Sequence, residues 1–187
     1  MRSRPGAVLL VWCCALAGCG SHSGATVQAA DAKHLVLQPG DLPSGYTEIG
    51  SGAQNPFTAN SVDPRRYGRK GGWYADYRRP PGVTTGALIV QSAVDVFGDA
   101  KGAGRELDAD RAKLEANAIP PPRLGDESVA GKVQGTGKPA AVVYTVAWRK
   151  GNVTSLAIVT GLSGKLTRAE VVKLARRADA HVAAATK

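Results

Sequence analysis

Apolar and polar residues alternate with a period of two in the stretch Trp73–Arg78, and this pattern constrains the fold more than any other feature of the chain. Such alternation predicts a β-strand with two different faces. After the turn at Pro80–Gly82, a second strand is expected from about Gly86 to Phe97. Asp99 is the expected N-cap of a following helix, whose apolar residues recur at helical spacing until prolines end it within residues 117–122.

The second half of the chain carries three more strand patterns. Residues 124–134 predict a weak strand and residues 141–148 a strong one. Residues 153–160 predict the strand that returns after a tight turn at residues 149–152. Because Leu156–Val159 are all apolar, this return strand is expected to be central in the sheet and covered on both faces.

The last element has the clearest helix signals. Thr167, with Glu170 three residues later, predicts a capping box, and Leu166 can pack against Val171 as a hydrophobic staple. An apolar stripe then continues at helical spacing to Ala185.

Residues 77–90 echo residues 148–159. Each stretch has an aromatic residue, two basic residues, a turn, Val-Thr-Thr or Val-Thr-Ser, and an apolar strand that runs into a helix. This similarity is explained either by an internal duplication or by chance, because hairpins often use the same residue types. A duplication predicts an α+β fold: an antiparallel sheet of about five strands, in the order ββαβββα, with two main helices packed on one face.

The amino-terminal residues have the pattern of an export signal. Arg2 and Arg4 precede an uncharged run, Ala7–Ala17, which has the length of a secretory signal and is too short to span a bilayer. The four residues Leu16-Ala17-Gly18-Cys19 resemble the lipobox of bacterial lipoproteins. The resemblance implies that Cys19 is diacylglycerylated and that the chain is cleaved in front of it. An ordinary secretory peptide is the alternative.

Cleavage before Cys19 predicts three parts: a signal peptide (1–18), a lipidated cysteine with a flexible tether (19–33), and one globular α+β domain (34–187). The chain would then sit on the extracytoplasmic face of the cell membrane. If there are two membranes, Gly20 favours the outer one by resemblance, and the envelope type stays open.

Composition limits how this mature chain is stabilised and what it meets. Cys13, Cys14 and Cys19 are the only cysteines, so the domain has no disulfide and depends on its core. Removing residues 1–18 takes away two arginines and no acid, leaving 22 basic against 15 acidic residues, or +7. Such a charge favours anionic partners.

A basic and aromatic stretch, residues 64–80, overlaps a segment at residues 49–71 that is expected to be long and irregular. Anionic lipid headgroups or anionic wall polymers are the expected targets, and nucleic acid is not. A purely structural interpretation stays open, with Trp73 and Tyr77 in the core and the arginines on a solvated strand edge. The candidate binding residues are Arg65, Arg66, Arg69, Lys70, Trp73, Tyr74, Arg78 and Arg79.

No catalytic or metal constellation is visible. The three histidines do not fall at ligand spacing, and the glycines of Gly98–Gly104 do not match a phosphate-binding loop. Asp126 and Glu127 are adjacent in a strand and so point to opposite faces. Gly161–Gly164 is not a nucleophile elbow. We therefore expect no cofactor, no metal and no enzymatic activity.

Several short motifs loosely resemble those of small lipoproteins of high-GC Gram-positive bacteria, some of which are similar in layout to PsbP-like α/β domains. The resemblance implies no catalytic residue. The motifs are Leu37–Pro43, Gly72–Arg79, Phe97–Ala103, Gly125–Glu127 and Trp148–Val153.

Three functions are consistent with these observations. The first is a non-enzymatic binding or sensing module for an envelope ligand or partner protein. The second is a hydrolase or transferase acting on envelope material. The third is a structural lipoprotein that binds anionic lipid or wall polymer through a basic face.

Overall fold

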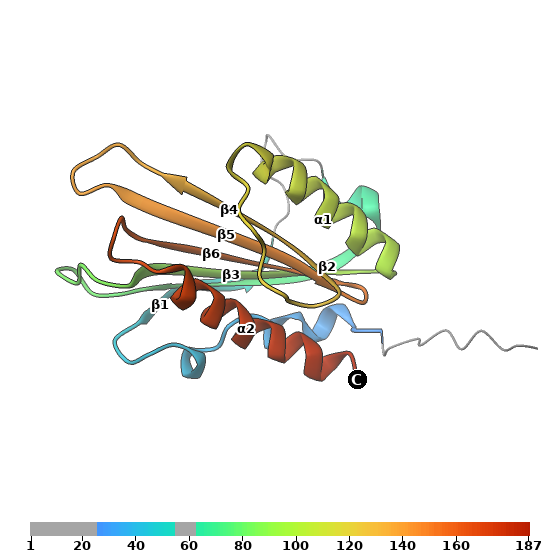
Figure 1. Cartoon of the computed structure of the whole chain (residues 1–187). Coiled ribbons are helices and arrows are strands. Elements are labelled where there is room, and N and C mark those ends of the chain that lie inside the picture. The colour runs from blue at the N-terminus through green and yellow to red at the C-terminus, as the bar shows by residue number, and fades with distance from the viewer. Residues whose placement is uncertain (1–25, 55–62) are drawn as a thin grey trace, which may run out of the picture.

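The computed structural model describes residues 26–54 and 63–187, which fold around one antiparallel sheet. In this part of the chain the sheet has six strands in the order β1-β2-β3-β6-β5-β4 (Figure 1). The expected α+β class and the two main helices are confirmed, but the element order is βββαβββα. The elements are β1 (Thr47–Ala53), β2 (Arg69–Arg78), β3 (Ala87–Phe97), α1 (Ala100–Leu114), β4 (Glu127–Gln134), β5 (Ala141–Lys150), β6 (Val153–Leu162) and α2 (Arg168–Ala185).

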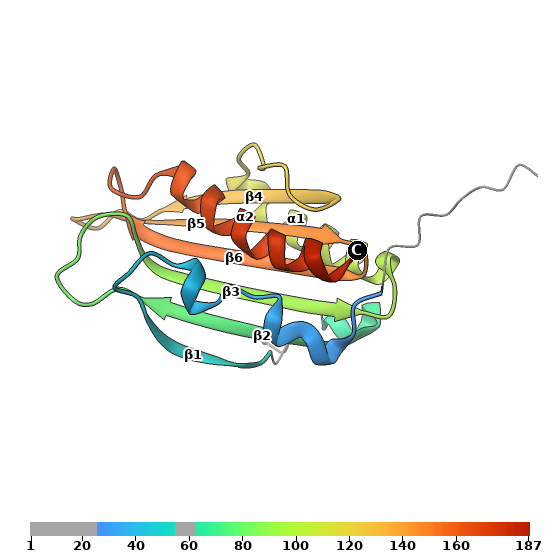
Figure 2. The same cartoon turned by 90° about the horizontal axis from the view of Figure 1, so that it is seen from below.

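The two helices lie on opposite faces of the sheet, so the prediction that both pack on one face is wrong. Figure 1 shows α1 above the sheet and α2 below it, and in Figure 2 α2 lies in front of the strands. We call the side covered by α2 the inner face and the side carrying α1 the outer face.

Strand sequences explain why both faces can be covered. On the outer face, Leu107 of α1 packs with Val129 and Ala147. On the inner face, the apolar stripe of α2 packs with alternate residues of the same strands, including Val146 and Ala157. β6 lies between β3 and β5, as its continuous apolar run predicted. A strand that is apolar on both sides favours a cover on both sides; α2 covers the inner face, and α1 covers part of the outer face.

Residues 27–33 are packed against the sheet, so the expected tether of residues 19–33 extends too far along the chain. Val27 is buried and exchanges two hydrogen bonds with the side chain of Asn152, at 3.0 and 2.9 Å. Farther along, Ser92 Oγ accepts a hydrogen bond from the Leu37 N–H, and the Tyr77 hydroxyl donates to the Leu37 carbonyl. Polar side chains of the sheet therefore hold residues 27–37, which we call the N-terminal segment.

β1 was missed because its sequence lacks a strand pattern. The strand contains two glycines and exposes Ile49, and residues 49–53 were expected to be irregular. β1 pairs with β2, and the ring of Tyr74 lies 3.6 Å from the position where a Cβ would stand on Gly50 or Gly52. Packing of a cross-strand ring on glycine stabilises a strand of this kind. Residues 55–62 of the expected irregular segment lie outside the described residues.

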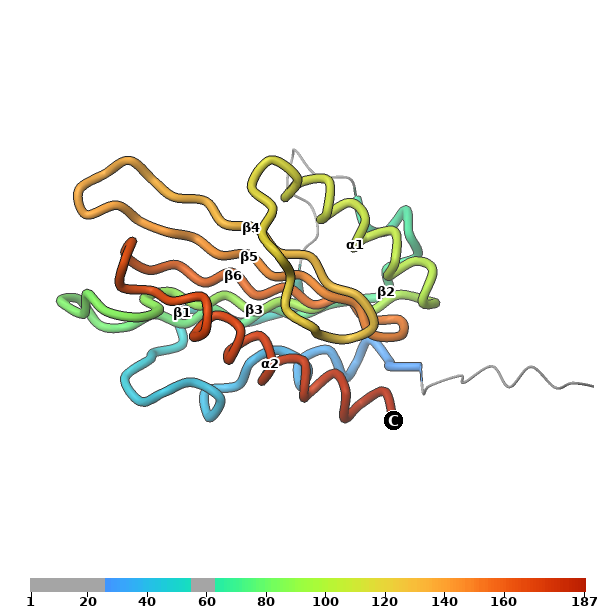
Figure 3. The backbone as a smooth tube through the Cα atoms, viewed as in Figure 1, coloured from blue at the N-terminus to red at the C-terminus, as the bar shows by residue number. Residues whose placement is uncertain are grey.

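Both predicted helix starts are confirmed. Asp99 Oδ1 accepts a hydrogen bond from the Gly102 N–H at 2.7 Å, and Thr167 and Glu170 form the capping box. After α1, the chain passes around the β4 edge to the inner face, where Leu124 joins the core (Figure 3). Within the described ranges, no helix is both long and apolar enough to cross a membrane.

Candidate functional site

Beside α1, the outer face of the sheet has an open hollow of about 590 Å³. Its floor comes from β2, β3 and β6, and the end of β1 forms one side. α1 packs against β4, β5, β6 and β3 and leaves this part of the outer face open. The lining residues are Ala53, Gln54, Tyr74, Asp76, Gln91, Ser92, Ala93, Leu156 and Ile158.

Strand register sets two rows of side chains on this floor. In one row, Asp76 on β2 lies opposite Gln91 on β3, which lies opposite Ile158 on β6. In the parallel row, Tyr74 lies opposite Ala93, which lies opposite Leu156. Polar groups therefore stand at the β2 side of the floor and aliphatic groups at the β6 side.

Asp76 is the one acidic side chain that lines this hollow in the part of the chain that the structure describes, and few other groups of the protein contact its carboxylate. Among the described residues its hydrogen-bond partner is the Gln91 amide, whose Nε2 donates to Asp76 Oδ1 at 3.4 Å. Burial raises the pKa of Asp76, and the hydrogen bond from Gln91 offsets this rise in part. A half-buried carboxylate with one long hydrogen bond can still accept donors from a ligand.

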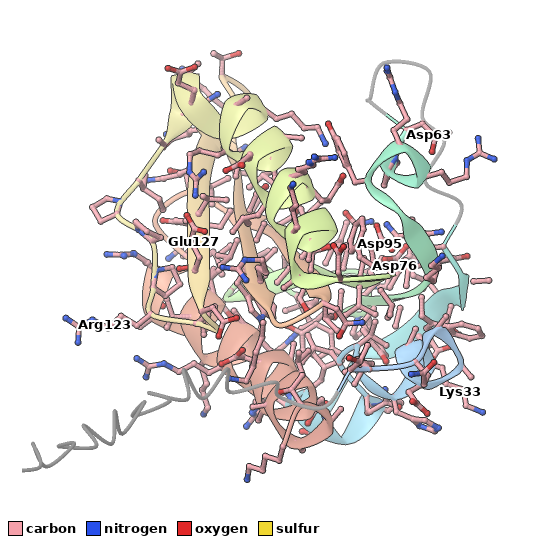
Figure 4. The ribbon with its side chains drawn as sticks, turned by 90° about the vertical axis from the view of Figure 1, so that its right-hand side faces the viewer. Lys33, Asp63, Asp76, Asp95, Arg123 and Glu127 are labelled. Atoms are coloured by element: carbon pink, nitrogen blue, oxygen red, sulfur yellow. The ribbon has the colours of Figure 1, made fainter. Side chains whose placement is uncertain are left out.

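A buried ion pair lies next to the hollow. Arg69 Nε donates to Asp95 Oδ1 at 2.6 Å, and the Nη2 of Arg69 donates to the carbonyl of Gln54, a lining residue (Figure 4 labels Asp76 and Asp95). Both side chains of the pair are less than one tenth exposed. A Cβ on Gly72 would stand 2.1 Å from Asp95 Oδ1, so a glycine at this position leaves room for the pair. Through this ion pair, Arg69 is held against Gln54 at one side of the hollow. Asp76 has no ion-pair partner among the described residues and stays open to a ligand.

Glu106 extends from α1 toward the same buried charges. It is 8% exposed, and its Oε2 has no hydrogen-bond partner among the described residues. Burial raises the pKa of Glu106 to about 7, with a further contribution from Asp110 and a smaller one from Asp95. The carboxyl group is therefore neutral over much of the acidic range and gains charge near neutral pH.

The eight candidate binding residues predicted from the sequence do not form one site. Tyr74 alone lines the hollow, while Trp73 points to the inner face and packs against the core. Arg69 is buried in its ion pair, and Arg79 stacks on the Tyr46 ring at 4.8 Å. The other four are Arg65 and Arg66 near Tyr67, Lys70 beside Gly98, and Arg78 at the end of β2. Whether these four bind a surface stays a prediction.

The charged side chains at other possible sites are paired with groups of the protein itself. A second hollow of about 500 Å³, between α1 and β4, is lined by Arg111 and Asp108, which pair with each other. Glu127 pairs with Arg111, and Asp126 accepts a hydrogen bond from the Gly151 N–H. In the described ranges no three potential ligands gather as a metal site.

Asp76, Gln91 and Ile158 were not among the site residues predicted from the sequence. Alternation did place Asp76 and Tyr74 on the face opposite Trp73. The missing information was which strands lie beside β2 and which part of the outer face α1 leaves open.

Comparisons with known proteins identify the fold and nothing finer. No family model matches the sequence, and no curated protein matches it. The crystal structure of the extracellular domain of PknH from Mycobacterium tuberculosis is similar, with a TM-score of 0.62 at 10% sequence identity. The likeness covers 84% of this chain and 99% of that one. At this identity the two chains share a fold.

Proposed function

We propose that this chain is an exported, lipid-anchored binding module without enzymatic activity, and that its ligand binds in the hollow beside α1. The observation that carries this proposal is Asp76, a half-buried carboxylate on the floor of an open hollow. Among the described residues it has one long hydrogen bond and no ion pair. A partly buried carboxylate that only stabilises a fold usually accepts more hydrogen bonds from the protein than Asp76 does.

Export and anchoring are supported by the amino-terminal sequence. The positive residues, the short apolar run and the Leu-Ala-Gly-Cys motif resemble a lipoprotein signal. A fold shared with a domain that is extracellular in PknH is compatible with this location. Two acyl chains on Cys19 would hold the chain stably at a bilayer.

The hollow fits a small amphipathic molecule. An ammonium or hydroxyl group of the ligand would donate to Asp76 and Gln91, which stand side by side. An apolar portion would lie on Ile158 and Leu156, and a ring would stack against Tyr74. A mixture of aliphatic floor and few convergent polar groups is typical of small-molecule sites.

An enzymatic function would need a second reactive group near Asp76. Among the described residues, the lining of the hollow contains a single carboxylate and neither histidine nor cysteine. Glycoside hydrolysis, the carboxylate chemistry expected on envelope sugars, uses a pair of carboxyl groups. The hollow therefore favours binding over catalysis.

Two matched probes test the site. We would titrate 2-phenylethylamine and 3-phenylpropionate, which share a ring and differ in charge, while recording backbone amide shifts by NMR. The amine should shift amides around Asp76 on β2 and β3, and the carboxylate should not. Asp76→Asn should abolish the response, and Glu115→Gln, which changes an exposed acid, should leave it intact.

Equal responses to both probes, or an unchanged response in Asp76→Asn, would contradict the proposed site. The anchor is tested separately on protein extracted from the membranes of its own host. Its intact mass should correspond to a chain that starts at an acylated Cys19, and Cys19→Ala should release the protein from the membrane fraction.

A further inference from the structure

The exposed side of α2 is a continuous basic surface on the inner side of the domain. At 100° per residue, Ala169, Lys173, Arg176 and Ala180 lie opposite the buried stripe, and the other residues of this surface lie along its sides. A shallow hollow of about 660 Å³ runs along it. We call this surface the α2 basic face; it consists of Arg168, Ala169, Val172, Lys173, Arg176, Arg177 and Ala180.

This surface is not neutralised by neighbouring acids. α2 contains two acidic residues: Glu170 is held in the capping box, and Asp179 is half-buried. Lys173 and Arg176 are exposed, and in the described part of the chain neither they nor Arg177 form an ion pair. Lys173, Arg176 and Arg177 therefore present their charge outward around a narrow strip of small side chains, while the Nη2 of Arg168 donates a hydrogen bond to the Pro120 carbonyl.

The chain enters the domain close to the last turn of α2. Val27 is hydrogen-bonded to Asn152, and the Thr186 methyl group lies 3.9 Å from the position of a Cβ on the adjacent Gly151. From Cys19 to Val27 there are eight residue steps, which reach at most about 28 Å when fully extended. α2 has 18 residues and is about 27 Å long. A bilayer that holds Cys19 is thus within reach of the whole helix.

We infer that the α2 basic face docks on the anionic phospholipid surface of the membrane to which Cys19 is attached. This inference rests on the lipid anchor of the proposed function. Each basic residue near an anionic surface adds attraction that salt weakens, and the short tether keeps the helix at a high local concentration of lipid headgroups.

Docking through α2 would orient the domain. The hollow with Asp76 lies on the outer face. Figures 1 and 2 show α2 on the other side of the sheet, the inner face. With α2 on the lipid, the hollow would open away from the membrane, toward ligands in the surrounding space.

Vesicle binding of the mature chain with Cys19→Ser tests the inference without the lipid anchor. Vesicles of phosphatidylcholine containing about one third phosphatidylglycerol should bind it, and pure phosphatidylcholine should not. The triple variant Lys173→Gln, Arg176→Gln and Arg177→Gln should lose at least tenfold in partition coefficient. A matched triple variant loses the same charge elsewhere and should lose less than threefold: Lys101→Gln, Arg105→Gln and Lys138→Gln.

A label on the helix gives an independent measurement that does not depend on removing charge. The Cys19→Ser chain has no other cysteine once residues 1–18 are removed, so a single introduced thiol can carry an environment-sensitive fluorophore. The label at Ala180→Cys on α2 should shift to the blue on anionic vesicles. The label at Ala112→Cys on α1 should not.

Three results would overturn the inference: no binding to anionic vesicles, equal loss in both triple variants, or equal spectral shifts at both labels. Binding to an anionic wall polymer without binding to vesicles would also overturn it and would assign the face to that polymer. Failure here would leave the probe titration at Asp76 unaffected, because the two surfaces lie on opposite faces of the sheet.

Discussion

Replacing Glu106 with glutamine should remove much of the pH dependence of stability of this domain. The carboxyl group is buried between α1 and the sheet, is 8% exposed, and has a pKa raised from 4.5 to about 7 in the folded state. The folded protein thus holds this proton more tightly than the unfolded chain. Stability from this group is therefore greatest at low pH and falls as the pH rises from about 4.5 to about 7.

The magnitude follows from the pKa difference. With a pKa near 4.5 unfolded and near 7 folded, the free energy of unfolding of the wild type should fall by about 2.5 kcal/mol between pH 5 and pH 8 from Glu106 alone. Glutamine resembles the neutral acid in shape, so Glu106→Gln should be within about 1 kcal/mol of the wild type at pH 5. At pH 8 the variant should be more stable by up to about 3.4 kcal/mol.

Urea unfolding at both pH values, followed by circular dichroism, measures this difference. The exposed Glu115→Gln serves as the control and should follow the wild type at both pH values. Asp76 and Asp95 also have raised pKa values and act in the same direction, but they are present in all three proteins. If Glu106→Gln loses as much stability between pH 5 and pH 8 as the wild type does, the reasoning about the buried carboxyl is wrong.

Three further substitutions test the packing around the site. Asn152→Ala removes three buried hydrogen bonds and should cost about 3 kcal/mol in urea unfolding, with faster amide hydrogen exchange in the N-terminal segment. Arg69→Leu leaves Asp95 buried without its partner and should cost about 3–5 kcal/mol at pH 7, whereas adding Asp95→Leu should recover most of the loss. Tyr74→Ala removes the ring that covers the β1 glycines and should cost about 2 kcal/mol, with exchange rising most in β1. A uniform rise in exchange across the sheet would contradict the local role of this ring.

Elements with strong local signals could be predicted from the sequence. The hairpin of β5 and β6 has clear strand patterns around a two-residue turn, and α2 has a capping box with a regular apolar stripe. β1 lacks such signals, because its stability comes from pairing with β2 and from Tyr74 rather than from its own side chains. The N-terminal segment was assigned in part to a tether because small residues such as Ala32 show no periodicity, although Ala32 is buried.

Asn152 shows how a local pattern can hide a tertiary role. From the sequence it is a turn residue, and it does follow Gly151 in the β5–β6 turn. In the fold its amide also binds Val27 and the carbonyl of Phe97, residues 125 and 55 positions away. A turn signal reports backbone preference and cannot report which distant backbone groups the side chain reaches.

The position of the helices decided whether a site could be predicted. The similarity of the two hairpins predicted that both helices pack on one face of the sheet. The apolar run in β6 predicted that both faces of this strand are covered. Two helices that cover the same strands cannot satisfy both predictions. The apolar run was the better guide because burial acts on each face separately, whereas similar hairpins do not fix the side to which the following helix crosses. With α1 on the outer face and angled over β4 to β6, the rows that contain Asp76 and Gln91 stay open. The candidate site is thus the part of a two-sided sheet that one helix cannot cover, and its location depends on the packing of α1 rather than on any motif in β2 or β3.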